Sequence, residues 1–272
     1  MKIFQFFFLF LNFHLFAQTP FSDITLDAGI DNIYDVYQGL FGGGAVAFDY
    51  NNDGYEDLFI TGGQGQDVLY NNNGDGTFKD VTKESGLYKE KMIVTTGVSS
   101  ADVNKDGFID LFVTTIASEV DPSKKKKTLA SNLLYINNGD GTFSDFSSKY
   151  GITKNNFSTS SSFGDINADG YPDLFVGNYF KNFYFEDSPF NTHNIALLNH
   201  YSINEEYETG DDELFINVEG KYFKEVSDLL MDSGKGYGFG GVFTDFDNDN
   251  DLDLFIINDF GETSESNRLL VN

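Results

Sequence analysis

One nine-residue acidic pattern occurs four times in the chain and has the composition of a metal site. The copies read DYNNDGYED from Asp49, DVNKDGFID from Asp102, DINADGYPD from Asp165 and DFDNDNDLD from Asp245. Side chains at positions 1, 3, 5 and 9 can converge on one point, and position 7 adds a backbone carbonyl. Six to eight oxygen ligands in a flexible cage suit Ca²⁺ better than Mg²⁺, which requires a strict octahedron. The pattern therefore predicts about four structural Ca²⁺ ions.

The candidate ligands occupy the same five positions in every copy. They are Asp49, Asn51, Asp53, the Tyr55 carbonyl and Asp57; Asp102, Asn104, Asp106, the Phe108 carbonyl and Asp110; Asp165, Asn167, Asp169, the Tyr171 carbonyl and Asp173; and Asp245, Asp247, Asp249, the Asp251 carbonyl and Asp253. Position 6, the sharp turn, is Gly in three copies and Asn250 in the fourth. Asn is the residue after Gly that best tolerates a left-handed backbone, so we expect the fourth loop to bind as well.

These loops have two other possible interpretations, an EF-hand and a solvated acidic turn. An EF-hand begins similarly but ends with a bidentate Glu at position 12. Position 12 here is apolar in every copy: Ile60, Val113, Val176 and Ile256. A solvated acidic turn would explain one copy, but four copies in register, each crowding three or four carboxylates, favour bound cations.

No pattern in the chain indicates catalysis. His193 and His200 are the histidines that follow the leader, and no nucleophile elbow, HExxH or phosphate loop accompanies them. Glycoside hydrolysis would need two carboxylates across a cleft, but nearly all the patterned carboxylates are explained as metal ligands. We expect the protein not to be an enzyme.

The elements that position the loops form a repeat. Each loop follows a small-residue stretch such as GGGAVAF and precedes Leu-Phe with an apolar or β-branched pair, which indicates strand, loop, strand. A second pattern follows, as in LLYINNGDGTFSDFS from Leu133, where NGDG signals a hairpin turn between a third and a fourth strand. Each repeat is therefore predicted to be a four-stranded meander.

The spacing of the repeats indicates a β-propeller. Length varies only in the connection between the second and third strands, which is typical of stacked units with one variable face. Four-stranded units arranged radially make an all-β propeller. We place the blades at about residues 40–87, 95–152, 158–230 and 236–272. The Ca²⁺ loops should lie on the face opposite the variable insertions.

The two ends of the propeller region also match the repeat. Residues 21–30, FSDITLDAGI, resemble the fourth strand in FKDVTKESGL (78–87), so we predict a closing strand there. NRLLVN at 267–272 matches a third strand. Either the four blades close on themselves or the sequence is a fragment of a larger ring, and its stop inside a turn motif favours the fragment.

The N-terminus and the composition bear on location and partners. Residues 1–17 carry Lys2, an apolar run and a small residue at Ala17, the layout of a signal peptide; the run is too short and too interrupted for a membrane anchor. We expect a secreted or cell-surface domain at 18–272 without a transmembrane segment. A net charge of −26 argues against nucleic acid, and the absence of cysteine excludes disulfides and thiolate metal sites.

The longest insertion, residues 178–212, is the candidate ligand site. It contains Tyr179, Phe180, Phe183, Tyr184 and Phe185, which could stack on sugars or anchor a protein, or could fold over their own blade. Lys124 to Lys127, in another insertion, are interpreted as a solvated loop tip.

These motifs resemble the FG-GAP/VCBS repeat family, in the form found in cartilage-acidic-protein-like and ASPIC/UnbV-associated secreted proteins. The resemblance rests on GGGAVAFDYNNDGYEDLFI, NLLYINNGDGTF and GYGFGGVFTDFDNDNDLDLF, and covers nearly everything from Phe21 onward. Integrin α-subunit propellers have similar loops, so the resemblance implies an adhesion or ligand-binding module for an extracellular protein or glycan. The alternatives are a non-catalytic propeller portion of an extracellular polysaccharide-degrading enzyme and a structural spacer.

Overall fold

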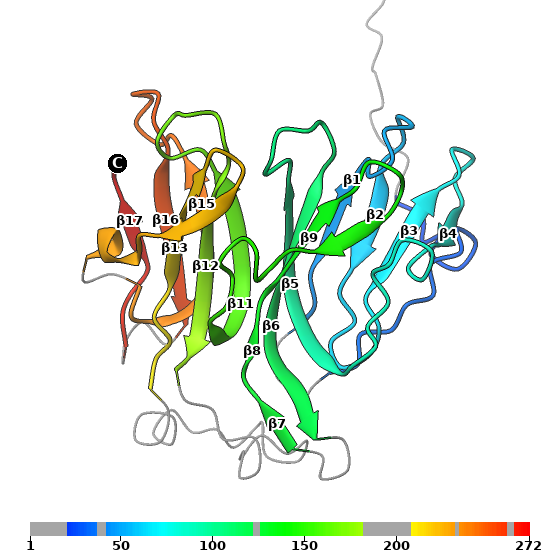
Figure 1. Cartoon of the computed structure of the whole chain (residues 1–272), viewed down its shortest axis with the longest axis horizontal. Coiled ribbons are helices and arrows are strands. Elements are labelled where there is room, and N and C mark those ends of the chain that lie inside the picture. Colours follow the sequence, from blue (N-terminus) through cyan, green and yellow to red (C-terminus); the bar gives the residue numbers. More distant parts are fainter. Residues whose placement is uncertain (1–20, 37–41, 122–125, 182–207, 232–233, 260–263) are drawn as a thin grey trace, which may run out of the picture.

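Four antiparallel β-sheets follow one another along the chain (Figure 1). The computed structural model describes residues 21–36, 42–121, 126–181, 208–231, 234–259 and 264–272. The regular elements of these residues are all β-strands apart from one short 3₁₀ helix at Ser227–Leu230. None of their helices is long and apolar enough to cross a membrane.

Each sheet is one blade, and the strands follow chain order from the inside outward. Blade 1 contains β1 (Ala45–Phe48), β2 (Asp57–Ile60), β3 (Val68–Asn72) and β4 (Phe78–Asp80). Blade 2 contains β5 (Ile93–Ala101), β6 (Asp110–Asp121), β9 (Leu133–Asn137) and β10 (Phe143–Asp145). Blade 3 contains β11 (Asn155–Gly164), β12 (Asp173–Phe180), β13 (Glu213–Val218) and β14 (Tyr222–Glu225). Blade 4 contains β15 (Tyr237–Thr244), β16 (Asp253–Asp259) and β17 (Arg268–Leu270).

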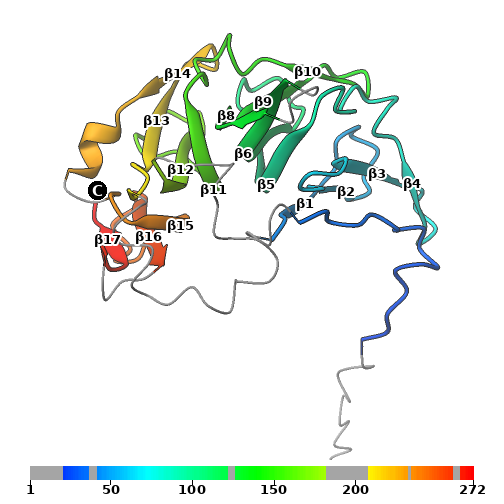
Figure 2. The ribbon, with the colours of Figure 1, turned by 90° about the horizontal axis from the view of Figure 1, so that it is seen from below.

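The blades are arranged radially in an open arc, with their first strands innermost (Figure 2). The first strands contact one another in sequence, β1 with β5, β5 with β11 and β11 with β15. The predicted all-β propeller is confirmed, and the open arc is what a propeller fragment looks like.

Small residues in the first strands allow this close approach. A Cβ on Gly44 would meet the backbone of Gly97 and Val98, and one on Gly97 would meet the Thr159 carbonyl. The glycine-rich stretches before the acidic loops thus let neighbouring blades pack backbone against backbone at the centre of the arc.

Among the described residues, the hydrophobic core consists of three layers between adjacent blades. Phe59 and Leu69 of blade 1 pack against Leu111 and Val113 of blade 2. The next two layers repeat the arrangement, with residues of blade 2 against blade 3 and of blade 3 against blade 4. A sheet therefore buries both of its faces only if it has a neighbouring blade on each side.

Residues 21–30 do not form the predicted closing strand; the described segment is irregular, with a turn at 25–29. The Ala28 carbonyl accepts the Phe78 N–H, as the Ser85 carbonyl accepts the Phe143 N–H one blade later. The segment therefore lies where the end of a preceding blade would lie. Its first residues are not paired because no sheet edge lies beside them in the described chain.

The two insertions of blades 2 and 3 differ in how much of them the structure describes. In blade 2, Lys126–Thr128 form β7, which extends the sheet by pairing with β6, so this part of the predicted loop tip is a hairpin. β8 (Ala130–Ser131) then pairs with β11 of the next blade. Lys124 and the greater part of the long insertion, at 182–207, lie outside the described residues, as does the predicted signal peptide.

Candidate metal centres

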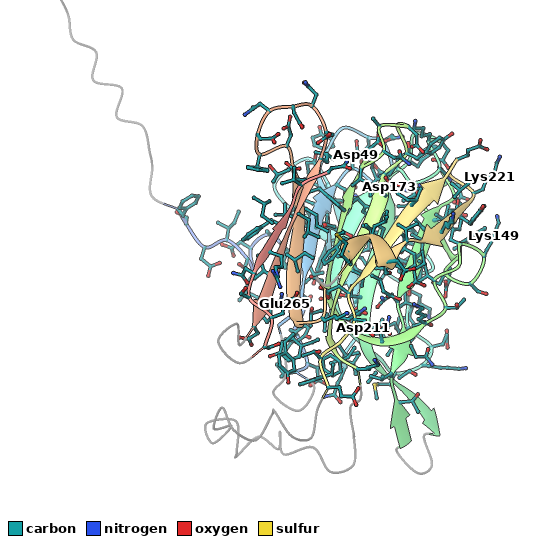
Figure 3. All side chains as sticks on the ribbon, turned by 90° about the vertical axis from the view of Figure 1, so that its left-hand side faces the viewer. Asp49, Lys149, Asp173, Asp211, Lys221 and Glu265 are labelled. Carbon is teal, nitrogen blue, oxygen red and sulfur yellow. The ribbon has the colours of Figure 1, made fainter. Side chains whose placement is uncertain are left out.

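Each acidic loop connects the first and second strands of its blade. The loop at 49–57 begins directly after β1, and its last residue, Asp57, opens β2. The other three loops occupy the equivalent connections, β5–β6, β11–β12 and β15–β16. Asp49 and Asp173 lie at one end of the blades, and Asp211 and Glu265, beside the second-to-third strand connections, at the other (Figure 3). This is the arrangement expected from the order of the strands.

The first Asp of each loop closes the turn with both carboxylate oxygens. In loop 1 the backbone N–H of Asp53 donates to Asp49 Oδ1 at 3.0 Å, and that of Gly54 to Asp49 Oδ2 at 2.8 Å. The equivalent bonds lie between 2.7 and 3.2 Å in the other three loops. The fifth-position Asp then accepts the N–H of position 7, for example Tyr55 N to Asp53 Oδ1 at 2.9 Å.

Two positions of each loop have a left-handed backbone. At position 6, φ is 89° at Gly54, 89° at Gly107 and 85° at Gly170. Asn250 has a φ of 78°, as expected for the sharp turn at this position. Position 4 is also left-handed in every loop, at Asn52, Lys105, Ala168 and Asn248. Sequence reasoning missed position 4 because Lys and Ala are residues that rarely adopt this conformation.

The last Asp of each loop is buried and accepts one N–H from its own loop and one from the end of the third strand. Asp110 accepts the N–H of Val103, within the loop, and of Asn137, at the end of β9, both at 2.9 Å. Asp57, Asp173 and Asp253 make the same pair of bonds, and all four are at most 1% exposed. A carboxylate has about four acceptor sites, so two N–H bonds leave lone pairs for a cation.

Burial and neighbouring carboxylates disfavour the charge on Asp57, Asp110 and Asp173. Desolvation, with a contribution from the carboxylates of Asp106 and Asp102, raises the pKa of Asp110 to about 7 although the two N–H bonds lower it. The same causes raise the pKa of Asp173 to about 6 and raise that of Asp57. A bound cation would relieve this cost by pairing with the ionised groups.

The fourth loop brings together the densest set of carboxylates. Oxygens of Asp245, Asp247 and Asp253 lie within 4.8 Å of one another. The other loops have Asn at position 3, whose amide oxygen accepts the N–H of position 5 at 3.0 Å. The donor set of every loop is therefore carboxylate and amide oxygen, which fits a hard cation such as Ca²⁺.

An asparagine outside the acidic motif connects each of the first three loops to the next blade. The Asn137 side chain of blade 2 donates to the Tyr50 carbonyl in the loop of blade 1 at 2.7 Å. Asn217 donates likewise to Val103 at 2.8 Å, and Asn272 to Ile166 at 2.7 Å. The recurring Asn at the end of the third strand was the available signal.

The structure describes only the first two residues of the predicted aromatic ligand site. Tyr179 and Phe180 belong to β12 and are 5% and 2% exposed, so these two rings pack within the protein. Phe183, Tyr184, Phe185, His193 and His200 lie outside the described residues.

Residues 49–113 and 123–176 match the family model of the FG-GAP-like repeat. The chain contains FG-GAP repeats. The matched ranges contain three of the four acidic loops, and the strand before the first of them, β1, lies just outside the match. FG-GAP repeats are found in β-propeller modules of extracellular and adhesion-type proteins. Comparison with curated proteins gave no match to the chain.

Proposed function

We propose that this FG-GAP propeller is a secreted, calcium-stabilised module that binds an extracellular protein or glycan and has no catalytic activity of its own. The observation that carries the calcium proposal is the fourfold repetition of one loop geometry, with oxygen donors at positions 1, 3, 5 and 9 and a buried carboxylate at position 9. Extracellular Ca²⁺ modules typically bind at about 10⁻⁴–10⁻³ M, which matches secretion into a calcium-rich medium.

The role proposed for Ca²⁺ is structural. Each ion would neutralise clustered carboxylates and fix the loop between the first and second strands of its blade. At free Ca²⁺ about tenfold above Kd, one site adds about 1.4 kcal/mol of stability. Four such sites would together match much of a typical domain's stability of about 5–15 kcal/mol.

Calcium stoichiometry tests this proposal directly. Equilibrium dialysis of the purified chain should give about four ions per chain. Asp53→Asn, Asp106→Asn, Asp169→Asn and Asp249→Asn should each weaken or remove one site. Glu84→Gln, an exposed acidic residue outside the loops, is the matched control. Binding of no Ca²⁺, or equal loss in the control, would contradict the proposal.

The ligand is proposed to bind on the face opposite the calcium loops. A cavity of about 560 Å³ opens there between the ends of β11, β12 and β13, and its lining includes Asn156, Lys181, Asp211 and Glu225. Amide, ammonium and carboxylate groups of this kind hydrogen-bond sugar hydroxyls or polar peptide groups. Screening of oligosaccharide and extracellular-matrix arrays should reveal a ligand whose binding is weakened by Lys181→Ala. Binding that is insensitive to this substitution would place the ligand elsewhere.

A further inference from the structure

Blade 1 has a buried lysine paired with the carboxylate that precedes its third strand. The ammonium of Lys89 lies 3.1 Å from Asp67 Oδ1, and the two side chains are 3% and 2% exposed. The same ammonium donates to the carbonyls of Gly63 at 3.3 Å and Ile93 at 3.2 Å. The Thr95 hydroxyl of blade 2 donates to the same oxygen of Asp67. The space between these blades therefore accommodates a lysine side chain, whose charge is matched by one carboxylate and neutral acceptors.

Blade 3 has the equivalent carboxylate without these donors. Asp212 is 2% exposed, its Oδ1 accepts the N–H of Asn178 at 2.8 Å, and no described residue donates to its Oδ2. The residue that corresponds to Thr95 in the next blade is Gly238, at the same distance before the first loop Asp, and it has no hydroxyl. An unpaired buried carboxylate oxygen is costly, so a donor from elsewhere would be stabilising.

The unpartnered oxygen lies beside the cavity of about 560 Å³ at the ends of β11, β12 and β13, which Asp212, Glu213 and Gly234 help to line. A Cβ on Gly234 would lie 3.5 Å from Asp212 Oδ2, so the absence of a side chain there leaves this oxygen uncovered on the cavity side. Glu213 is 4% exposed, and its Oε1, which has no hydrogen bond, lies 3.4 Å from Lys154 Nζ. The cavity thus contains two buried carboxylates with unfilled acceptor sites.

Two lysines of the cavity lining are paired with other carboxylates. Lys154 Nζ lies 2.5 Å from Glu225, and Lys181 Nζ lies 3.3 Å from Asp211. The sequence at 182–207 and 232–233, outside the described residues, contains neither Lys nor Arg. A cation that pairs with Asp212 as Lys89 pairs with Asp67 is therefore expected to come from a ligand.

An ammonium group fits this position better than a metal ion. In the part of the chain that the structure describes, a group of three carboxylates close enough to share an ion is found at Asp245, Asp247 and Asp253 and not around Asp212. A metal ion needs several such oxygens, whereas an ammonium has three donors that one carboxylate and neutral acceptors satisfy.

We propose that this cavity takes a lysine side chain of an extracellular protein ligand, with the ligand's ammonium paired to Asp212. This inference rests on the proposed function and specifies the chemistry of its ligand. A lysine is favoured over an amino sugar because its charge lies at the end of a flexible four-carbon stem, which can reach a carboxylate that is only 2% exposed. Phe180 and Met231 also line the cavity and provide apolar contacts for such a stem.

A peptide titration of the purified chain in Ca²⁺, followed by nuclear magnetic resonance, tests the inference. The probe is a blocked peptide with one lysine between glycines, and the comparison peptide has glutamine instead. We expect saturable binding of the lysine peptide alone. Asp212→Asn should weaken this binding about tenfold or more, because a hydrogen bond between charged groups is lost. The variant should fold, since Asn132 occupies the same position in blade 2.

Glu84→Gln, which removes one exposed charge from blade 1, is the control and should bind the lysine peptide like the wild type. No binding of the lysine peptide at millimolar concentration, or equal binding by Asp212→Asn and the wild type, overturns the inference. Glucosamine is titrated in parallel, and binding of glucosamine without the peptide also overturns it. A ligand from the array screens that depends on Lys181 but not on Asp212 would reject the lysine and leave the proposed function standing.

Discussion

Each blade has an Asp or Asn immediately before its third strand. The side chains of these four residues have different hydrogen-bond and charge partners. In every blade the side-chain Oδ1 of this residue accepts the backbone N–H of the residue five positions after the last loop Asp, at 2.7–2.9 Å; the four residues are Asp67, Asn132, Asp212 and Asn267. The blades differ in the other partners of the side chain. At Asp67 and Asn132 these partners come from the residues that lead into or form the first strand of the next blade.

Asp67 is neutralised by a buried lysine. Lys89 Nζ lies 3.1 Å from Asp67 Oδ1, and Thr95 Oγ1 donates to the same oxygen at 2.5 Å. Removing one partner of a buried pair leaves an unpaired charge, so Lys89→Met should lower the free energy of unfolding by about 3–5 kcal/mol.

The double variant Lys89→Met, Asp67→Asn provides the control for this prediction. Asn132 already occupies the equivalent position in blade 2, so the double variant should recover most of the lost stability. Chemical denaturation of the three proteins measures the effect. Equal stability of the wild type and Lys89→Met would show that the ion pair contributes nothing.

Asp212 has no such partner. It is 2% exposed and its Oδ2 has no hydrogen bond. Desolvation, with contributions from Glu265, Asp211 and Glu213, raises its pKa to about 8. A carboxyl group with a raised folded-state pKa stabilises the fold below its unfolded pKa, and this contribution is lost as the pH rises toward 8.

Asp212→Asn should therefore be more stable than the wild type, with a difference that is smallest near pH 4 and grows to a plateau of a few kcal/mol above pH 8. Thermal unfolding of both proteins across this pH range measures it. A difference independent of pH would show that Asp212 does not ionise on unfolding. Sequence patterns did not reveal these residues, because Asp and Asn alternate at the position and Lys89 and Thr95 come from outside the motif.

At the scale of the elements, the acidic motif predicted most of the loop. The flanking strands, the turn at position 6 and the shared end of the blades follow from residue types and order. The two N–H bonds to the last Asp were not predictable, since one of them comes from the third strand. In blade 3 that strand, β13, is separated from β12 by the long insertion.

The inter-blade asparagine gives a prediction at this scale. Asn137→Ala would remove the bond to the Tyr50 carbonyl and leave that buried group unsatisfied, so it should cost about 1–3 kcal/mol. Asn138→Ala, at the exposed neighbouring position, should cost well under 1 kcal/mol, because its bonds to Thr142 and Ser144 are open to solvent. Denaturant unfolding compares the two, and similar losses would contradict a role for Asn137 between blades.

For the whole molecule, the repeat spacing predicted a propeller but not how its blades are completed. The pattern at 21–30 was interpreted as a strand, yet a strand forms only beside a free edge, and the edge of β17 lies at the other end of the arc. Sequence periodicity describes each blade and its neighbour, whereas ring closure depends on contacts between the two ends.

The net charge of −26 is also a property of the whole molecule. Self-repulsion of this size destabilises a compact state, and four Ca²⁺ ions placed in one row of loops would reduce it where carboxylates are densest. Full stability is therefore expected to require bound calcium.

Thermal unfolding of the purified chain in millimolar Ca²⁺ and in excess chelator tests this claim most directly. We predict a cooperative transition whose midpoint falls strongly on chelation, and a smaller calcium-dependent shift when Asp53, Asp106, Asp169 and Asp249 are replaced by Asn. An identical midpoint in both conditions would contradict the claim that these loops are structural calcium sites.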